Sequence, residues 1–302
     1  MNCRSLFLRA AASLLLSGAL LPAQAADPLA RVRASQTLNL GFVAGDAPFS
    51  AGTAEQPSGY AIELCGLLGE QLKQQLGLPT LTLRYQQLSV AEMFEAVTQG
   101  RVDTVCSAVG DTLKRREQVN FSLPYFAAGL GVVVRRDAPA SLLTPLNEGA
   151  QARGPVWRAS VNQGLKRHSF AVLKDSVSVD WARARMRALG LQSELREVPS
   201  NAQGLAMVVN GEVDAFFADR LVLLNYQAEN PRGSELMVPE RLFEVLPVAL
   251  PLARGDDAWR LAVDRGLSAV QRSAAGQALY ARYFGAPNEQ NQLLMKLFQR
   301  PE

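Results

Sequence analysis

The stretch Gly100–Phe126, GRVDTVCSAVGDTLKRREQVNFSLPYF, carries the strongest fold signal in this sequence. It opens on a glycine that stops a preceding helix, and a short buried strand follows and ends near Cys106. The small residues Ser107–Gly110 predict a turn that exposes backbone groups at the carboxyl end of the strand, and Asp111 or Thr112 can cap the next helix. The stretch therefore predicts a strand held between two helices and followed by a polar turn.

A second unit of this kind lies 111 positions further along the chain, at Gly211. The expected helix Val90–Gln99 precedes Gly100, and the expected helix Leu205–Asn210 precedes Gly211. Both glycines are helix stops that lead into a short strand. Two such units, one in each half of the chain, predict two similarly built α/β lobes.

Strands and helices alternate through the remaining sequence. The expected strands are Thr37–Val43, Leu81–Tyr85, Gly131–Arg135, Phe170–Leu173 and Leu246–Leu252, and the expected helices are Ala61–Leu76, Leu113–Val119, Val179–Leu189 and Trp259–Phe284. This alternation predicts an α/β fold in which each lobe is a mainly parallel sheet flanked by helices.

The order of these elements also predicts the limits of the lobes. Residues 36–131 and 248–302 are expected to form lobe 1, and residues 132–247 to form lobe 2. The chain then crosses near Gly131–Arg135 and returns near Pro247–Leu252, which makes these two segments the expected hinge. Because ligands of open α/β sheets bind beyond the carboxyl ends of the strands, we expect a cleft between the lobes.

The first 25 residues predict a secretory signal peptide. Arg4 and Arg9 precede the apolar run Ala10–Leu21, and a small-residue cleavage site ends at Ala25. The apolar run is shorter than the roughly 20 residues that a membrane anchor needs. We therefore expect cleavage after Ala25 and a location in the periplasm.

The composition is that of an ordinary folded protein, with 48% hydrophobic and 20% charged residues among 302. It excludes a disordered chain, a collagen and a polytopic membrane bundle. Without Arg4 and Arg9 the basic and acidic residues nearly balance, so we expect neither nucleic acid nor an anionic membrane as the principal partner.

Cys65 and Cys106 are the two cysteines that remain after the signal peptide. In an oxidising compartment such a pair is often bridged, and only one pairing is possible. Two buried thiols acting as small hydrophobic residues explain the same pattern equally well.

Motifs for catalysis, cofactors and metals are missing from the sequence. There is no glycine-rich dinucleotide or phosphate loop, no nucleophile elbow and no zinc-type cluster of His and Cys. The single histidine, His168, follows Lys166 and Arg167 and is expected to be a solvated surface residue. We therefore expect no cofactor, no metal and no enzymatic activity.

The segment Gly100–Phe126 resembles the bacterial family 3 solute-binding proteins, the periplasmic amino-acid receptors of ABC importers. In these proteins a Gly-x-Val-Asp strand leads through a polar loop to a threonine, an arginine three positions later, and a Phe-Ser-x-x-Tyr-like motif. The matching residues are Gly100, Val102, Asp103, Thr112, Arg115, Phe121, Ser122, Pro124 and Tyr125, with further agreement at Ala47–Phe49, Gly59–Leu64 and Ala215–Asp219. The resemblance covers essentially the whole mature chain and is closest to the glutamate/aspartate-type branch.

This resemblance implies a two-lobed, type II periplasmic-binding-protein clamshell that captures an amino acid or similar zwitterionic solute and delivers it to a membrane ABC permease. It implies that Arg115 binds the α-carboxylate of the ligand and that Asp219 binds its α-ammonium. The remaining residues expected at the site are Asp46, Phe49, Ala108, Gly110, Ser176 and Val177, with Phe49 as an apolar wall. A cation on one lobe and an anion on the other can both contact a zwitterion only when the cleft closes. We expect the protein to be a monomer.

The sequence also departs from the acidic-ligand branch. Val43 and Met93 stand where receptors for acidic amino acids carry additional arginines, and Asn201 stands where that branch has a histidine. Asp46 adds negative charge nearby. Because a buried, unpaired charge is costly, we expect neutral or basic ligands to be preferred over glutamate and aspartate.

An enzymatic alternative comes from the same fold, since some of its members are dehydratases that act on cyclic carboxylic acids. Such an enzyme needs a positioned acid or base in the cleft. His168 is poorly placed for this role, and Asp219 already has a binding role. Binding is therefore favoured over catalysis.

Overall fold

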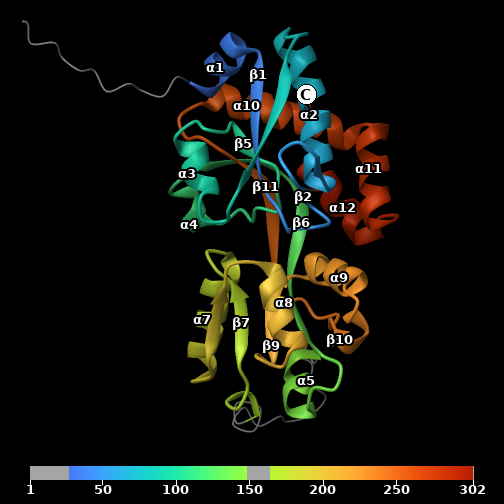
Figure 1. Cartoon of the computed structure of the whole chain (residues 1–302). Helices are drawn as coiled ribbons and strands as arrows, with labels where there is room; N and C mark the ends of the chain where they lie inside the picture. The colour runs from blue at the N-terminus through green and yellow to red at the C-terminus, as the bar shows by residue number, and fades with distance from the viewer. Residues whose placement is uncertain (1–26, 148–163, 302) are drawn as a thin grey trace, which may run out of the picture.

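The computed structural model describes residues 27–147 and 164–301, and the expected signal peptide lies outside these ranges. The described residues form two α/β units, one above the other in Figure 1. The long strands β6 (Asn120–Arg135) and β11 (Glu244–Leu252) join them. No helix in the described ranges is long and apolar enough to cross a membrane.

The first unit is built on a three-stranded parallel sheet in the order β4-β1-β5. Its strands are β1 (Thr37–Val43), β4 (Thr82–Leu88) and β5 (Thr104–Val105), and the short ribbon β2 (Ala51–Gly52) and β3 (Pro57–Ser58) stands beside them. Its helices are α1 (Pro28–Ser35), α2 (Tyr60–Leu76), α3 (Met93–Thr98), α4 (Leu113–Arg116), α10 (Asp257–Arg272), α11 (Ala274–Phe284) and α12 (Glu289–Phe298).

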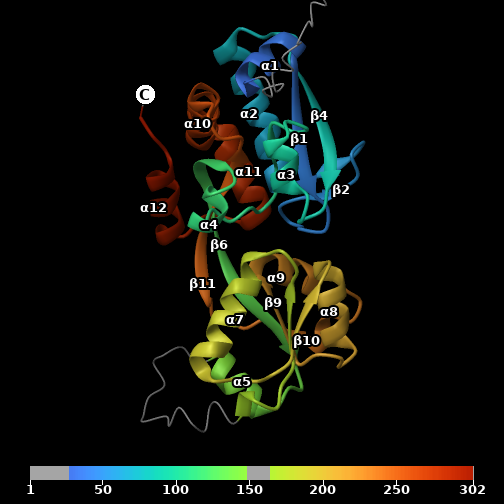
Figure 2. The same ribbon diagram turned by 90° about the vertical axis from the view of Figure 1, so that its left-hand side faces the viewer.

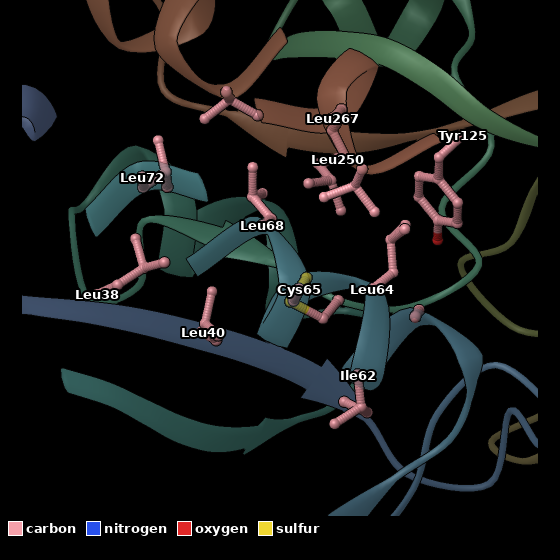
Figure 3. Packing of buried hydrophobic residues seen from close by; sticks show 14 of the residues in the cluster. Leu38, Leu40, Ile62, Leu64, Cys65, Leu68, Leu72, Tyr125, Leu250 and Leu267 are labelled. Carbon is pink, nitrogen blue, oxygen red and sulfur yellow. A yellow bond between two sulfur atoms is a disulfide. The ribbon is translucent and has the colours of Figure 1, made fainter. Parts of the chain in front are cut away.

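The core of the first unit forms between α2 and the sheet. Leu64, Leu68 and Leu72 recur every four residues on α2, so they share one face of the helix, and all three are buried. They belong to one cluster with Leu38 and Leu40 of β1 (Figure 3). Burying each such side chain stabilises the fold by about 1.5–3 kcal/mol, so these contacts fix α2 against the central strand of the sheet.

A disulfide joins Cys65 of α2 to Cys106 at the end of β5. The two Cα atoms are 6.3 Å apart, and both residues are fully buried in the core of the first unit, where Figure 3 labels Cys65. Of the two alternatives that the sequence left open, the structure contains the bridge. The bridge ties α2 to the turn that follows β5.

The second unit is built on a sheet in the order β10-β6-β9-β7-β8, with β11 also paired to β6. Its further strands are β7 (Phe170–Leu173), β8 (Leu195–Val198), β9 (Ala215–Asp219) and β10 (Leu236–Met237). Its helices are α5 (Ala140–Asn147), α7 (Val177–Leu189), α8 (Asn201–Val209), α9 (Arg220–Glu229) and the 3-10 helix η1 (Gly233–Glu235).

The second sheet is mixed rather than mainly parallel. Strand β7 runs parallel to β8 and β9, whereas β6 runs antiparallel to β9, β10 and β11. The antiparallel pairing of β6 with β11 follows from the connection between the units. Strand β6 brings the chain into the second unit and β11 takes it back, so the two strands run in opposite directions. The α/β class with two sheets is confirmed; the first sheet is parallel throughout, and the second is parallel only across β8, β7 and β9.

Both faces of the second sheet are covered by helices. Val132 and Phe217 belong to the core cluster that includes residues of α7, while their neighbours Val133 and Phe216 belong to the cluster that includes residues of α8. Successive residues of a strand point to opposite faces, and Figure 2 shows α7 and α8 on opposite sides of the strands. This explains why these strands are apolar throughout.

The repeated helix–glycine–strand unit is confirmed. Gly100 and Gly211 follow α3 and α8 and adopt left-handed φ angles of 68° and 72°. Each donates its amide to the carbonyl oxygen three residues earlier, at 3.1 Å in both units. A residue with a Cβ is strained in this conformation, so glycine permits the same sharp exit into β5 and β9.

Three expected helices are shorter in the structure, and the one expected at Val90–Gln99 is limited to α3, Met93–Thr98. The span Trp259–Phe284 is divided at Ser273, whose hydroxyl caps α11 by accepting a hydrogen bond from the amide of Gly276 at 3.0 Å. A Cβ at Gly276 would lie 2.1 Å from the carbonyl oxygen of Val270, so the chain turns more tightly here than one continuous helix allows. Helix α4 ends at Arg116 because the chain soon enters β6.

The passage between the units lies earlier on β6 than expected. Phe126 packs in the core of the first unit and Leu130 packs in the core of the second. The facing residues of β11 run from Glu244, opposite Leu130, to Val248, opposite Phe126. The segment Gly131–Arg135, where the crossing was expected, therefore lies within the second sheet. The prediction placed the crossing too late because only the buried end of this 16-residue strand shows a clear apolar run in the sequence.

Candidate binding site

A cavity of ≈ 100 Å³ lies between the two units and is lined by residues of both. Of the residues expected at the site, its wall includes Asp46, Ala108, Gly110, Arg115, Ser176, Val177 and Asp219. The wall follows the carboxyl ends of β1, β5, β7 and β9. Drug-sized ligands occupy pockets of roughly 300–1,000 Å³, so this cavity suits a compact ligand.

Arg115 provides the cation of the cavity wall. Thr112 caps α4 by accepting a hydrogen bond from the Arg115 amide at 3.2 Å. This hydrogen bond fixes the backbone position from which the Arg115 side chain extends. The guanidinium donates from Nη1 to the carbonyl oxygen of Gly110 at 2.9 Å and lies 5.1 Å from the ring centre of Phe94. Burial lowers the pKa of Arg115 to about 10, so the group stays charged at neutral pH.

Asp219 provides a carboxylate from the second unit. It ends β9 and caps α9, and its Oδ1 accepts hydrogen bonds from the amides of Leu221 at 2.8 Å and Val222 at 3.3 Å. Its Oδ2 is buried and accepts no hydrogen bond within the described part of the chain. Burial raises the pKa of Asp219 to about 6, although the amides of Val222, Leu221 and Gly129 oppose this shift.

Asp46 adds a second carboxylate from the loop after β1. Its Oδ1 accepts a hydrogen bond from Asn201 Nδ2 at 3.0 Å, which links this loop to the start of α8. Burial raises the pKa of Asp46 to about 7, the charge of Asp219 adds to the shift, and the hydrogen bond from Asn201 opposes it. The cavity therefore contains one guanidinium and two carboxyl groups.

The loops around Ser176 and Gly110 offer backbone groups. The Ser176 hydroxyl is engaged within its own loop, because it donates to the carbonyl oxygen of Leu173 at 2.6 Å and accepts from the Ser178 amide at 3.2 Å. Val177 is the first residue of α7. A Cβ at Gly110 would lie 3.6 Å from Arg115 Nη1 and 3.4 Å from Leu246, which is ordinary contact, so the glycine leaves room without being sterically required.

Ser107 lines the cavity and was not expected at the site. Its hydroxyl accepts a hydrogen bond from the Val43 amide at 2.8 Å and lies 2.7 Å from the Ser50 hydroxyl. Its carbonyl oxygen accepts from the Tyr125 hydroxyl at 2.7 Å. Ser107 thus positions the turn that follows the disulfide, and its place directly after Cys106 is the only sequence signal that could have indicated this role.

Val43 and Met93 form an apolar part of the wall. Their residue exposures are 7% and 4%, so the cavity has no cationic side chain at these two positions. Asn201 was noted only as a departure from the acidic-ligand branch, yet it lines the cavity and contacts Asp46.

Phe49 does not line the cavity. Its side chain is fully buried in the core of the first unit, with ring centres of Phe126 and Phe284 at 5.1 and 5.7 Å. The expectation of an apolar cleft wall was wrong at this residue, because a nearby group of aromatic rings takes up the side chain.

His168 was expected to be solvated, and this was wrong as well. Only 10% of its side chain is exposed. Its Nε2 lies 3.2 Å from the Ser141 hydroxyl, and its Nδ1 lies 3.4 Å from Asp214 Oδ1. The aspartate of the repeated unit holds the ring against the second unit, and His168 is not part of the cavity wall.

The two units touch beside the cavity. The hydrogen bond from Asn201 to Asp46 joins them, and the Tyr226 hydroxyl approaches the Gly45 carbonyl oxygen at 3.5 Å. An exposed ion pair adds to these contacts, with Lys114 Nζ 2.7 Å from Asp180 Oδ2. Side chains of both units therefore contact each other next to the cavity.

Comparison with known proteins places these features in context. The profile described as bacterial extracellular solute-binding proteins, family 3, matches residues 38–286. The L-glutamate/L-aspartate-binding protein of Pseudomonas aeruginosa is 23% identical over 94% of this chain and 88% of its own length.

Solved structures show the same fold. An ancestral arginine-binding protein bound to glutamine superposes with a TM-score of 0.68 at 20% identity, over 83% of this chain and 98% of that protein. A substrate-binding protein of an ABC uptake transporter from Streptococcus pneumoniae, with bound histidine, gives a TM-score of 0.70 at 15% identity over 86% and 97% of the two chains.

Proposed function

This chain belongs to the bacterial extracellular solute-binding proteins, family 3, and we propose that it captures an amino acid between its two units for a membrane ABC permease. The observation that carries this proposal is the presence of Arg115 and Asp219, from opposite units, in the wall of one small cavity. A zwitterion presents one anion and one cation at a short separation. It can therefore pair with both groups at once.

The roles that we propose follow from the N–H donors of the Arg115 guanidinium and from the carboxylate oxygen Oδ2 of Asp219. Arg115 binds the α-carboxylate, since a planar guanidinium with several N–H donors suits a carboxylate. Asp219 binds the α-ammonium through its Oδ2, which is buried without a hydrogen-bond donor among the described residues. Backbone groups of Ala108, Gly110 and Ser176 complete the contacts around the ligand.

We propose two lobes with the expected limits of 36–131 with 248–302 and of 132–247, except that the first limit moves back to the part of β6 between Phe126 and Leu130; the hinge lies there and at the facing residues of β11. The transfer of β6 from one core at Phe126 to the other at Leu130 supports this position. Because the ligand contacts both lobes, it favours the closed state.

The ligand that we propose is neutral or basic rather than acidic. Val43 and Met93 leave the wall apolar where a side-chain carboxylate would need a cation, and Asp46 would repel it. The proposed location is the periplasm, with removal of the signal peptide after Ala25. The leader pattern of Arg4, Arg9 and the apolar run supports it, as does membership of an extracellular family.

The dehydratase alternative has less support. His168, the single histidine of the chain, lies outside the cavity wall. The family match favours binding over catalysis.

The proposal is tested with ligands found by a thermal-shift screen of amino acids and then measured by calorimetry. Arg115→Met and Asp219→Asn should each weaken binding by about 2–5 kcal/mol, the usual cost of removing one partner of a buried charged pair. Asparagine caps helices as well as aspartate does, so Asp219→Asn should keep the cap on α9. An alanine at this position would remove both functions.

Arg116→Met is the matched control, because Arg116 pairs with Asp111 through two hydrogen bonds of 2.7 and 2.6 Å and does not line the cavity. Its affinity should equal that of the wild type. Unchanged affinity in both Arg115→Met and Asp219→Asn would overturn the proposed grip on the amino acid.

A further inference from the structure

Three side chains of the cavity wall carry hydrogen-bond acceptors, and two of the three are carboxyl groups. Asp219 Oδ2 and Asn201 Oδ1 are both buried, and neither has a hydrogen-bond donor within the described residues. Asp46 contributes a further carboxylate to the same wall. The wall thus offers acceptors from three side chains on two units.

The orientation of Asn201 follows from its neighbours. Its Nδ2 lies 3.0 Å from Asp46 Oδ1 and 3.4 Å from the carbonyl oxygen of Gly45, and both of these atoms are acceptors. The amide nitrogen must therefore occupy this side, which leaves Oδ1 on the other side of the group without a partner. Asn201 is only 5% exposed, so bulk water does not satisfy this oxygen.

The charges of the wall are also unequal. Among the described residues of the wall, Arg115 is the one cation, and Asp46 and Asp219 are the two carboxyl groups. Much of the remaining wall is apolar, from Val43 and Met93 to Leu173 and Val222. A neutral amino acid satisfies Arg115 and one carboxylate and leaves the other carboxylate without a cationic partner.

We propose that Asp46 and Asn201 form a subsite for a second cationic nitrogen, so that the ligand is an amino acid with a short basic side chain. This inference rests on the proposed function, in which Arg115 and Asp219 hold the α-carboxylate and α-ammonium. A side-chain ammonium has three N–H donors, which Asp46 and Asn201 Oδ1 can accept. The ligand then carries one net positive charge and balances the cavity.

The size of the cavity limits the length of this side chain. At ≈ 100 Å³ it is well below the roughly 300–1,000 Å³ of drug-sized pockets. Burial raises the pKa of Asp46 to about 7, so its charged form is poorly stabilised without a ligand and gains most from a nearby cation. A diamino acid such as 2,4-diaminobutyrate combines a cation with a short chain.

The test compares two probes of equal chain length by calorimetry, L-2,4-diaminobutyrate with a side-chain ammonium and L-homoserine with a neutral hydroxyl. L-ornithine and L-lysine extend the series. Wild-type protein should bind diaminobutyrate at least tenfold more tightly than homoserine. Asp46→Asn should reduce this preference at least tenfold, because it removes the charge and keeps an oxygen acceptor.

Asp175→Asn is the matched control for the general effect of charge. Asp175 lies beside Ser176 at a left-handed φ of 59°, which asparagine also adopts, and it does not line the cavity. This variant should keep the wild-type preference. Asn201→Ala, which removes the unpartnered oxygen, should lower diaminobutyrate affinity more than homoserine affinity.

The outcomes separate this inference from the proposed function. Binding of homoserine or other neutral amino acids as tight as that of diaminobutyrate overturns the cationic subsite and leaves the amino-acid function intact. If neither the probes nor any amino acid in the screen binds, both proposals are wrong. The wild-type ligand series decides the inference by itself if Asp46→Asn fails to fold.

Discussion

Each of the two α/β units contains the repeated helix–glycine–strand segment just before the residues that line the cavity. The residues that follow this segment differ between the two units. In the first unit Asp103 follows Gly100 and accepts a hydrogen bond from the Asn39 amide at 2.7 Å. In the second, Asp214 follows Gly211 and accepts one from the Ser169 amide, also at 2.7 Å. Each aspartate thus joins the new strand to the sheet at an equivalent point.

Beyond these strands the two units diverge. The chain after β5 contains the disulfide at Cys106, the turn at Ser107 and then Arg115, whereas β9 ends directly on Asp219, which caps α9. The first unit therefore presents its cation from a turn that is tied to the core, and the second presents its anion from the strand end itself. The repeated helix–glycine–strand segment forms part of the sheet in both units. The residues that follow it provide the charged groups of the cavity, Arg115 in the first unit and Asp219 in the second.

The largest expected effect concerns the disulfide, which ties down the binding turn in the first unit alone. Replacing Cys65 and Cys106 together by alanine should lower the free energy of unfolding by about 4 kcal/mol, since the bridge closes a loop with a sequence separation of 41. Chemical denaturation measures the loss. Hydrogen exchange should speed up more in α2 and β5 than in the strands of the second unit.

Reductant provides the control for this comparison. It should destabilise the wild type under denaturing conditions and leave the double alanine variant unchanged, because no other disulfide is expected in the mature chain. A loss below 1 kcal/mol would mean that the two units hold their binding edges equally well without a covalent link.

A second prediction concerns the carboxyl groups that the two units contribute to the cavity. The folded pKa values of Asp46 and Asp219, about 7 and about 6, lie above the ordinary value of 3.8. The folded protein therefore binds these protons more tightly than the unfolded chain does, so its stability falls as the pH rises from about 4 to about 7. Without ligand, Asp46→Asn should exceed the wild type in stability at pH 8 by about 1–2 kcal/mol, less than the full shift because the lobes can open.

Melting temperatures of the wild type and Asp46→Asn between pH 4 and pH 8 measure this effect. The advantage of the variant should disappear near pH 4, where the wild-type carboxyl is protonated. A constant difference across the whole range would show that the effect does not come from titration of Asp46.

The smallest effect is expected at the surface contact between the units. Lys114 and Asp180 pair at 2.7 Å with side chains that are 74% and 60% exposed. Such pairs contribute about 0.2–1 kcal/mol, so Lys114→Gln should weaken ligand binding less than about fivefold. The difference in ligand affinity between the wild type and Lys114→Gln should vanish at about 1 M salt, where charges are screened within about 3 Å.

Lys73→Gln is the control for this variant. Lys73 pairs with Glu70 inside α2 at 2.7 Å and makes no contact across the units in that pair. Its replacement should leave ligand affinity unchanged at every salt concentration. A large, salt-independent effect of Lys114→Gln would mean that Lys114 does more than hold the units together.

Local patterns in the sequence were sufficient for most of the scaffold. Strands β1 and β7 have the predicted bounds, and the paired stops at Gly100 and Gly211 predicted the repeat, since apolar periodicity and glycine conformation are local properties. The resemblance to family 3 also brought Arg115 and Asp219 forward as site residues. Spacing alone would have left Arg115 as a surface residue.

Tertiary structure decided what depends on contacts between distant segments. The bridge of Cys65 to Cys106, the burial of Phe49 among aromatic rings and the placement of His168 against Asp214 each join residues from separate elements. The meeting of Asn201 with Asp46 is of the same kind, since these residues are 155 positions apart. A residue's own neighbours in sequence determine its helix or strand, but the burial and partners of its side chain depend on which elements pack together, and only the folded chain determines that.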